Sequence, residues 1–177
     1  MNNPWKTLAQ RVVYKNNWIT VREDQVERPD GKPGIYGVVL LRPSVAVVAV
    51  NQNKDVALVG QWRYPVERFS WEIPRGAVDD SEHTIQAAAE RELREEAGLA
   101  AQDWRGFGFL DLCNGVLRSQ EHLFLATGLH PVEAERCGDE RIVLRWSPYR
   151  DALAMIENGE ITDATTVAAL YRIAQHL

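Results

Sequence analysis

The strongest structural signal in the chain is an amphipathic helix over residues 81–98. This segment is rich in Ala, Glu and Arg, which are strong helix formers, and its apolar residues recur every four positions, at Ile85, Ala89 and Leu93. Ser81 is the predicted N-cap, and Gly98 suits the left-handed position that follows a helix. The apolar side of such a helix is expected to pack on a sheet.

Short strand-like runs supply that sheet. Val, Ile and aromatic residues are concentrated in segments 18–27, 35–41, 45–50, 56–62, 107–112, 122–126 and 142–146. Pro-Asp-Gly at 29–31 is a turn signal, so the first two runs should form a hairpin. Two further helices are expected at 149–158 and 164–176. Interleaved strands and helices indicate an α/β (α+β) fold, a mixed sheet with helices packed on it, preceded by a small N-terminal antiparallel β piece. We divide the chain into residues 1–42 and 43–177.

Length and charge exclude several classes of protein. The longest apolar run, 45–50, has six residues, far short of the roughly 18 or more that a membrane-spanning helix needs. The N-terminus lacks the pattern of a secretory signal, and the two cysteines form no C-x-x-C, so we expect a cytoplasmic protein with reduced thiols. A net charge of −5 makes nucleic acid an unlikely partner. A polyanionic substrate would require a recruited cation.

The predicted helix carries a cluster of acidic residues. Glu92 lies three positions before Glu95 and four before Glu96, so the three carboxylates can converge near one side of the helix. Like charges at this spacing repel. The partner could be Arg91 or Arg94, or a divalent cation such as Mg²⁺ or Mn²⁺, which prefers carboxylate oxygens. An ordinary solvated face with ion pairs is the alternative.

The surrounding residues make a longer pattern. Gly76, Glu82 and the run R-E-L-R-E-E-A-G-L at 91–99 together resemble the signature of the Nudix hydrolases. Five residues separate Gly76 from Glu82, as in that signature, but eight separate Glu82 from Arg91, one more than the signature has. We interpret this as a one-residue insertion before the helix. It bears on whether Glu82 pairs with Arg91, as the resemblance implies, and leaves the three glutamates unchanged.

Flanking segments are similar to one branch of this family, the ADP-ribose and nucleoside diphosphate sugar pyrophosphatases. They are Q-W-R-Y-P-V at 61–66, W-E-I-P-R-G at 71–76 and D-A-T-T at 163–166, with Trp62 and Arg75 as departures. The resemblance implies a Nudix-type α/β/α sandwich. It also implies that the N-terminal piece is exchanged between the subunits of a homodimer, which places residues 1–42 at a dimer interface.

The resemblance also implies the catalytic residues. Glu92 and Glu96 are expected to bind Mg²⁺, or Mn²⁺, directly, with Glu95 serving a second ion and the backbone carbonyl of Arg75 nearby. In similar enzymes the base that activates water comes from a late acidic loop. Glu140 is our choice for this base, and Asp139 and Glu135 are the alternatives.

Expected substrate contacts lie in both parts of the chain. Arg63 matches a family arginine that grips phosphate or the distal sugar, a task that suits a planar guanidinium. Glu72 is a further expected substrate contact. Trp18 and Tyr36 correspond to aromatic residues that stack on the nucleobase in some relatives, although packing in a core or interface is an equal alternative. The resemblance does not specify adenine, because Gly37 stands where relatives can carry an acidic residue.

The predicted activity is metal-dependent hydrolysis of a nucleoside diphosphate sugar, with ADP-ribose as first choice, to a nucleoside monophosphate and a sugar phosphate. One alternative keeps the chemistry but changes the substrate to nucleoside triphosphates, dinucleoside polyphosphates or RNA 5′ ends. The other is a nucleotide-sugar-binding module without turnover. The presence of all three signature glutamates, Glu92, Glu95 and Glu96, argues against a binding module, because a protein that only binds gains nothing obvious from mutually repelling carboxylates.

Overall fold

The chain folds into two compact units. A computed structural model describes residues 2–134 and 141–176. The N-terminal unit runs to Pro43 and also contains Asp111–Gln120, and the C-terminal unit comprises Ser44–Leu110 and the chain from Glu121 onward. The sequence-based division has a single boundary, at 42/43, so the segment Asp111–Gln120 differs from it.

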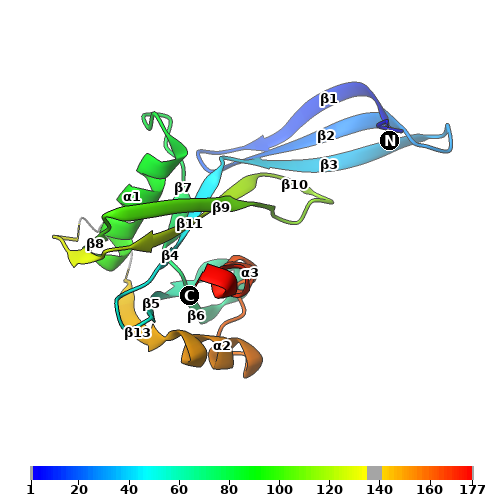
Figure 1. The fold of residues 1–177 in the computed structure, drawn as a ribbon. Helices are drawn as coiled ribbons and strands as arrows, with labels where there is room; N and C mark the ends of the chain where they lie inside the picture. Colours follow the sequence, from blue (N-terminus) through cyan, green and yellow to red (C-terminus); the bar gives the residue numbers. More distant parts are fainter. Residues whose placement is uncertain (1, 135–140, 177) are drawn as a thin grey trace. The chain divides into compact units, whose positions relative to one another are not determined.

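The N-terminal unit is a four-stranded sheet with the order β1-β2-β3-β10 (Figure 1). Its strands are β1 (Lys6–Lys15), β2 (Ile19–Glu27), β3 (Pro33–Leu41) and β10 (Leu117–Arg118). The hairpin expected at 18–41 is confirmed as antiparallel β2 and β3. Gly31 has φ +78° in the turn, a backbone conformation that glycine adopts without strain. Strand β1 was not predicted from the sequence. Every residue in it is exposed, so it carries no pattern of buried apolar positions.

The C-terminal unit contains two main sheets. One has the order β7-β4-β11-β9 and the other β13-β5-β6, while a two-residue pair joins β8 to β12. Strands β4 and β11 are parallel and the pair β4 and β7 is antiparallel, so the first sheet is mixed, as predicted. The bounds are β4 (Ser44–Ala49), β5 (Asp55–Arg63), β6 (Arg68–Glu72), β7 (Arg75–Ala77), β8 (Leu99–Ala100), β9 (Asp103–Asp111), β11 (Gln120–Thr127), β12 (His130–Pro131) and β13 (Val143–Pro148).

Helices cover both faces of these sheets (Figure 1). They are α1 (Ile85–Ala97), α2 (Tyr149–Glu157) and α3 (Ala164–Ile173), with short 3₁₀ turns at Tyr64–Val66 and Ala174–His176. Successive side chains of β4 point to opposite faces of the sheet, and those on both faces are buried. Val45 and Val47 pack with Leu93 of α1, whereas Val48 packs with Leu170 of α3. The predicted α/β/α sandwich is therefore confirmed.

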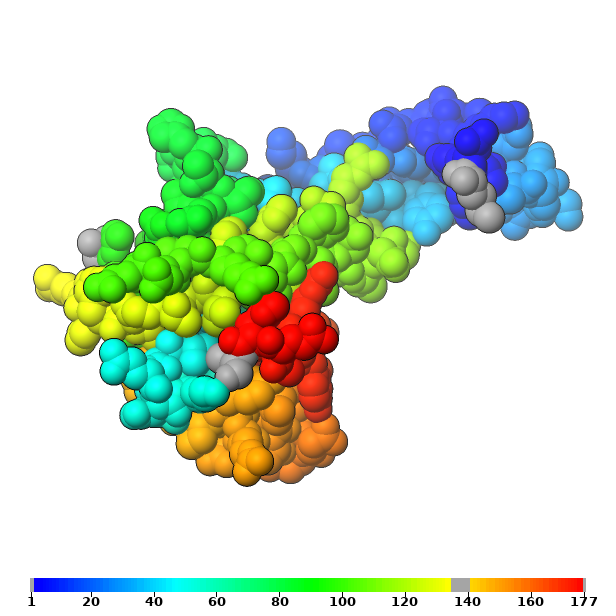
Figure 2. Space-filling model, in the orientation of Figure 1, coloured from blue at the N-terminus to red at the C-terminus, as the bar shows by residue number. Residues whose placement is uncertain are grey.

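The start of α1 differs from the prediction. The N-cap is Thr84, whose hydroxyl accepts a hydrogen bond from the backbone N–H of Ala87 at 3.1 Å, and Ser81 lies in the preceding loop. This loop, green in Figures 1 and 2, projects from the surface of the C-terminal unit, and Ser81 is exposed in it. The extra residue of the signature is thus accommodated in solvent. Gly98 ends the helix at φ +64°, as predicted.

No helix in the described part of the chain is both long and apolar enough to span a membrane.

The two candidate caps can be compared directly. Replacing Thr84 with Ala should lower the free energy of unfolding by about 1 kcal/mol, because the N–H of Ala87 loses its side-chain partner. Ser81→Ala is the matched control and should change it by less than about 0.5 kcal/mol. Urea unfolding of the two variants measures both values. If Ser81→Ala lowered the free energy of unfolding more than Thr84→Ala does, Ser81 would be the N-cap, as predicted from the sequence.

Candidate active site

Helix α1 presents acidic side chains to strand β7. Glu92 and Glu96 are one helical turn apart and are 8% and 4% exposed, respectively, whereas the Glu95 side chain is 25% exposed. Buried carboxylates are costly unless positive charge or hydrogen bonds compensate them. The structure therefore has to supply partners for this face of the helix.

Arg91 supplies most of the compensating charge. Its guanidinium donates to Glu92 at 2.7 Å, to Glu95 at 2.8 Å and to Glu82 at 3.0 Å. It also donates to the backbone carbonyl of Ala77 in β7, at 2.7 Å. Burial would lower the pKa of Arg91, but its carboxylate partners outweigh burial and raise it. Glu82 thus pairs with Arg91 despite the additional residue between them.

Gly76 lets Glu92 approach the strand. A Cβ atom at this position would lie 1.9 Å from Oε1 of Glu92, so no side chain fits while the carboxylate stays where it is. Beside it, the backbone N–H of Arg75 donates to Oε2 of Glu96 at 2.8 Å, and the Gln61 amide lies 3.5 Å from Oε1. The family resemblance implies that the carbonyl of Arg75 lies near the metal, and that contact stays a prediction. The observed contact with Glu96 is made by the N–H.

The donor set suits a divalent cation. Glu92, Glu95 and Glu96 offer only carboxylate oxygens, the ligands that Mg²⁺ and Mn²⁺ prefer, and Gly76 leaves room for the carboxylate of Glu92. Within the described residues, however, no three acidic, His or Cys side chains are already arranged around a common point. The Arg91 guanidinium binds both Glu92 and Glu95, so a cation would share these carboxylates with it.

Arg63 and Glu72, both expected to contact substrate, form an ion pair with each other. Nε and Nη2 of Arg63 donate to the two oxygens of Glu72 at 2.9 and 2.7 Å. Burial would raise the pKa of Glu72, but the guanidinium of Arg63 holds it below its usual value. Both residues line a cavity of about 310 Å³ in the C-terminal unit, together with Arg68, Arg75, Thr162 and Asp163.

The side chain of Arg75 makes contacts that sequence reasoning missed. Its guanidinium donates to both oxygens of Glu121 in β11 and to Asp163 at the start of α3. Glu121 is fully buried and also accepts a hydrogen bond from the Thr165 hydroxyl. Burial raises the pKa of Glu121, against the influence of Arg75. The only signal in the sequence was a charged residue at the start of an apolar strand.

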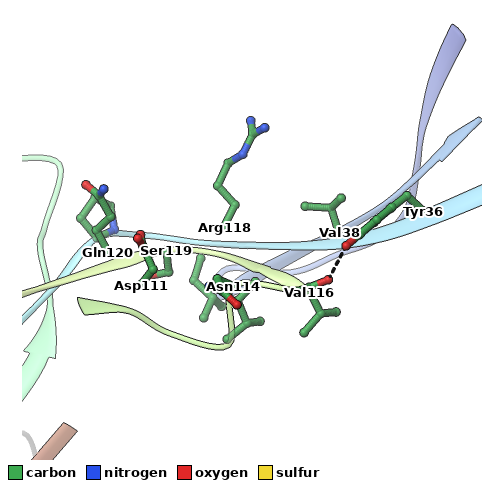
Figure 3. A pocket seen from close by; sticks show the side chains of 12 residues that line it. Tyr36, Val38, Asp111, Asn114, Val116, Arg118, Ser119 and Gln120 are labelled. Carbon is green, nitrogen blue, oxygen red and sulfur yellow. Dashed lines mark hydrogen bonds between the residues drawn. The ribbon is translucent and has the colours of Figure 1, made fainter. Parts of the chain in front are cut away.

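Trp18 and Tyr36 belong to the N-terminal unit. Trp18 is exposed, and the ring of Tyr36 packs edge-on against Trp5 at a centroid distance of 5.4 Å. The Tyr36 hydroxyl donates to the carbonyl of Gly115 at 2.9 Å, at the end of a pocket of about 570 Å³ that β3 forms with residues 111–120. Figure 3 shows this hydroxyl turned toward the loop before β10, with Arg118 extending away from it. The predicted role of these two aromatic residues stays a prediction.

The predicted catalytic base, Glu140, lies outside the described residues, as do its alternatives Asp139 and Glu135. Its role also stays a prediction.

Comparisons with known proteins cover nearly the whole chain. Residues 5–39 match the nucleoside diphosphate sugar hydrolase N-terminal domain, and residues 40–170 match the NUDIX domain. The chain is 30% identical to an ADP-ribose pyrophosphatase of Mycobacterium tuberculosis, over 96% of this chain and 83% of that protein. It is 32% identical to an ADP-ribose pyrophosphatase of Bacillus subtilis, over 93% and 90%. An RNA pyrophosphohydrolase of Tolumonas auensis is 42% identical, but over 35% of this chain and 33% of that one.

A solved structure has the same fold. The crystal structure of an ADP compounds hydrolase superposes with a TM-score of 0.87 and 22% sequence identity, covering 98% of this chain and 94% of that one.

The contact between Gly76 and Glu92 can be tested by adding one methyl group. In Gly76→Ala the new Cβ should displace the Glu92 carboxylate, a flexible side-chain end, so the fold should survive while Mn²⁺ binding weakens about ten-fold or more. Gly37→Ala is the control, because a Cβ there meets no atom within 4 Å. Titration with Mn²⁺ followed by electron paramagnetic resonance measures both. Unchanged affinity in Gly76→Ala would remove Glu92 from the predicted ligands.

Proposed function

The chain belongs to the NUDIX family, and from this membership we propose that it hydrolyses the pyrophosphate bond of a nucleoside diphosphate sugar. ADP-ribose is the first substrate to test, with a nucleoside monophosphate and a sugar phosphate as products. The match of residues 5–39 to the N-terminal domain of nucleoside diphosphate sugar hydrolases supports this substrate class. The names of the two relatives similar over most of their length support ADP-ribose.

The observation that carries the proposal is the pair of buried glutamates on α1, held against the glycine-containing strand β7. Nudix hydrolases generally depend on divalent metal ions. Glu92 and Glu96 would bind Mg²⁺ or Mn²⁺, with Glu95 at a second ion. When bound there, the metal supplies positive charge against the pyrophosphate and makes its bridging oxygen easier to expel. An acidic protein can bind an anionic substrate through such a cation.

Other side chains have roles that follow from their chemistry. Arg63 would offer its guanidinium to a phosphate or the distal sugar, and Glu72 would keep that guanidinium oriented through their bidentate ion pair. Glu140 would accept the proton of the attacking water. A Glu140→Gln variant should lower kcat without changing metal affinity, and a silent variant would move the role to Asp139 or Glu135.

The N-terminal unit would contribute the aromatic residues. Trp18 and Tyr36 would stack on the nucleobase, and we propose that this unit forms the interface of a homodimer. The exposed apolar residues Leu8 and Ile35 on its strands support an interface. Sedimentation equilibrium should then give about 40 kDa, twice the 20.0 kDa of one chain.

The expected reduced thiols of Cys113 and Cys137 support a cytoplasmic location.

A substrate panel tests the activity. ADP-ribose, GDP-mannose, UDP-glucose, a nucleoside triphosphate and a 5′-triphosphate RNA are each incubated with the protein and Mg²⁺ or Mn²⁺, and the products are separated by ion exchange. Metal-dependent cleavage of a diphosphate sugar to a monophosphate is the expected result. Turnover of only the triphosphate or the RNA would show that the substrate is not a nucleoside diphosphate sugar. Binding of a nucleotide sugar without turnover would favour a nucleotide-sugar-binding module.

The metal assignment predicts a sharp difference between two glutamates of α1. Glu96→Gln should abolish turnover with little change in stability, because an amide oxygen can still accept the hydrogen bond from the Arg75 N–H but carries no charge for a cation. Glu90→Gln is the matched control, since Glu90 is exposed and bonds only to Gln86 among the described contacts. Steady-state kinetics with thermal unfolding compares the two. Full activity in Glu96→Gln would contradict the assignment.

A further inference from the structure

We propose that Arg75 is a positioning residue for Glu96, held in an acidic socket formed by Glu121 and Asp163. This arginine departs from the family pattern, and neither its guanidinium nor Glu121 has a part in the proposed reaction. The inference rests on the proposed function in one respect, the binding of a divalent cation by Glu96.

The socket holds the guanidinium on two sides. Nε and Nη2 donate to the two oxygens of Glu121 at 2.9 and 3.1 Å, which is the bidentate geometry that fixes an arginine most firmly. Nη1 donates to Oδ1 of Asp163 at 2.8 Å. All three nitrogens of Arg75 therefore have carboxylate partners, and its side chain is only 22% exposed. This guanidinium is committed to the protein and is poorly placed to bind an anionic substrate.

The acidic side chains of the socket are themselves anchored. Asp163 is the N-cap of α3, and its Oδ2 accepts hydrogen bonds from the backbone N–H and the hydroxyl of Thr166, both at 2.8 Å. The Thr166 hydroxyl in turn accepts a hydrogen bond from the N–H of Ile73, at 3.1 Å. Thr165 binds Glu121. The network thus ties the N-terminus of α3 to β11 and to the segment between β6 and β7, with Glu121, Thr165 and Thr166 buried.

The backbone of the same arginine holds the metal-site glutamate. The N–H of Arg75 donates to Oε2 of Glu96 at 2.8 Å. Strand β7 has only three residues, and the residue before it, Pro74, has no N–H to add a hydrogen bond. Antiparallel pairing with β4, and the hydrogen bond from the Val47 N–H to the Pro74 carbonyl at 2.8 Å, hold one edge of this segment. The side chain of Arg75 adds an anchor toward β11 and α3, which backbone pairing does not supply. If the guanidinium leaves its socket, the backbone N–H that orients Glu96 is held by β4 alone and its position is less strictly fixed.

Removing the arginine alone would also destabilise the fold, because Glu121 would keep a buried negative charge without its arginine partner. A loss of activity could then come either from a displaced Glu96 or from a less stable protein. The test therefore uses Arg75→Met and the double variant Arg75→Met/Glu121→Gln, which removes both charges. Tyr149→Phe is the matched control in the same unit. It removes the hydrogen bond from the Tyr149 hydroxyl to the carbonyl of Leu170 in α3, at 2.8 Å, and none of the hydrogen bonds of the socket.

Three quantities are measured on each full-length variant: the melting temperature, the dissociation constant for Mn²⁺ alone, and kcat with KM for the substrate that the wild type hydrolyses. We expect the double variant to regain much of the melting temperature that Arg75→Met loses. Its Mn²⁺ dissociation constant should nevertheless stay about ten-fold or more above that of the wild type, with kcat lowered to a similar extent and KM changed less than about two-fold. Tyr149→Phe should lower the melting temperature but neither metal affinity nor kcat.

The outcomes separate this inference from the proposed function. A double variant with wild-type Mn²⁺ affinity and kcat would show that Arg75 is merely structural and overturn the inference. The inference would equally fail if Tyr149→Phe weakened Mn²⁺ binding as much as the double variant does. A wild-type chain that binds no Mn²⁺ would overturn both the inference and the metal-dependent function. If the wild type binds Mn²⁺ but hydrolyses none of the substrates, the proposed function fails, and the Mn²⁺ dissociation constants of the wild type and the double variant still test the inference: equal values would overturn it.

Discussion

The need to compensate clustered negative charge governs the C-terminal unit. Carboxylates of α1 are pressed against a backbone strand, where desolvation would otherwise expel them or neutralise them. Arg91 compensates Glu92 and Glu95 of α1 directly. Two further arginines compensate neighbouring carboxylates: Arg63 binds Glu72 of β6, and Arg75 binds Glu121 of β11 and Asp163. Of the three, Arg75 links elements that are distant in sequence. Because more carboxylates than arginines meet here, the region retains a negative charge that an added cation could balance.

Local sequence patterns predicted the parts of the fold that depend on local forces. The continuous apolar run of β4 and the four-residue spacing in α1 are local patterns, so these elements were found from sequence. The cap at Thr84 was misplaced at Ser81, because both residues suit an N-cap and only the path of the loop decides between them. Strands of two or three residues, such as β7 and β8, carry no periodic signal at all.

The site was predictable only where its residues are close in sequence. The glutamates of α1 and Arg91 fall within six positions, so their convergence follows from helical geometry. The Arg63 and Glu72 pair depends on the register of β5 and β6, and the sequence indicated the residues but not that they bind each other. Glu121 and Asp163 are separated by 46 and 88 positions from Arg75, and no local rule connects them.

The insertion of Asp111–Gln120 into the N-terminal unit makes the two units inseparable by a single cut. The polypeptide crosses between them at Pro43, again at Asp111, and once more after Gln120. Strand β10 pairs with β3, so a chain that began at Ser44 would leave β10 without that neighbour. Removal of residues 1–43 would therefore leave Asp111–Gln120 as a loop whose strand β10 has lost its pairing partner, and not a cleanly separated second unit.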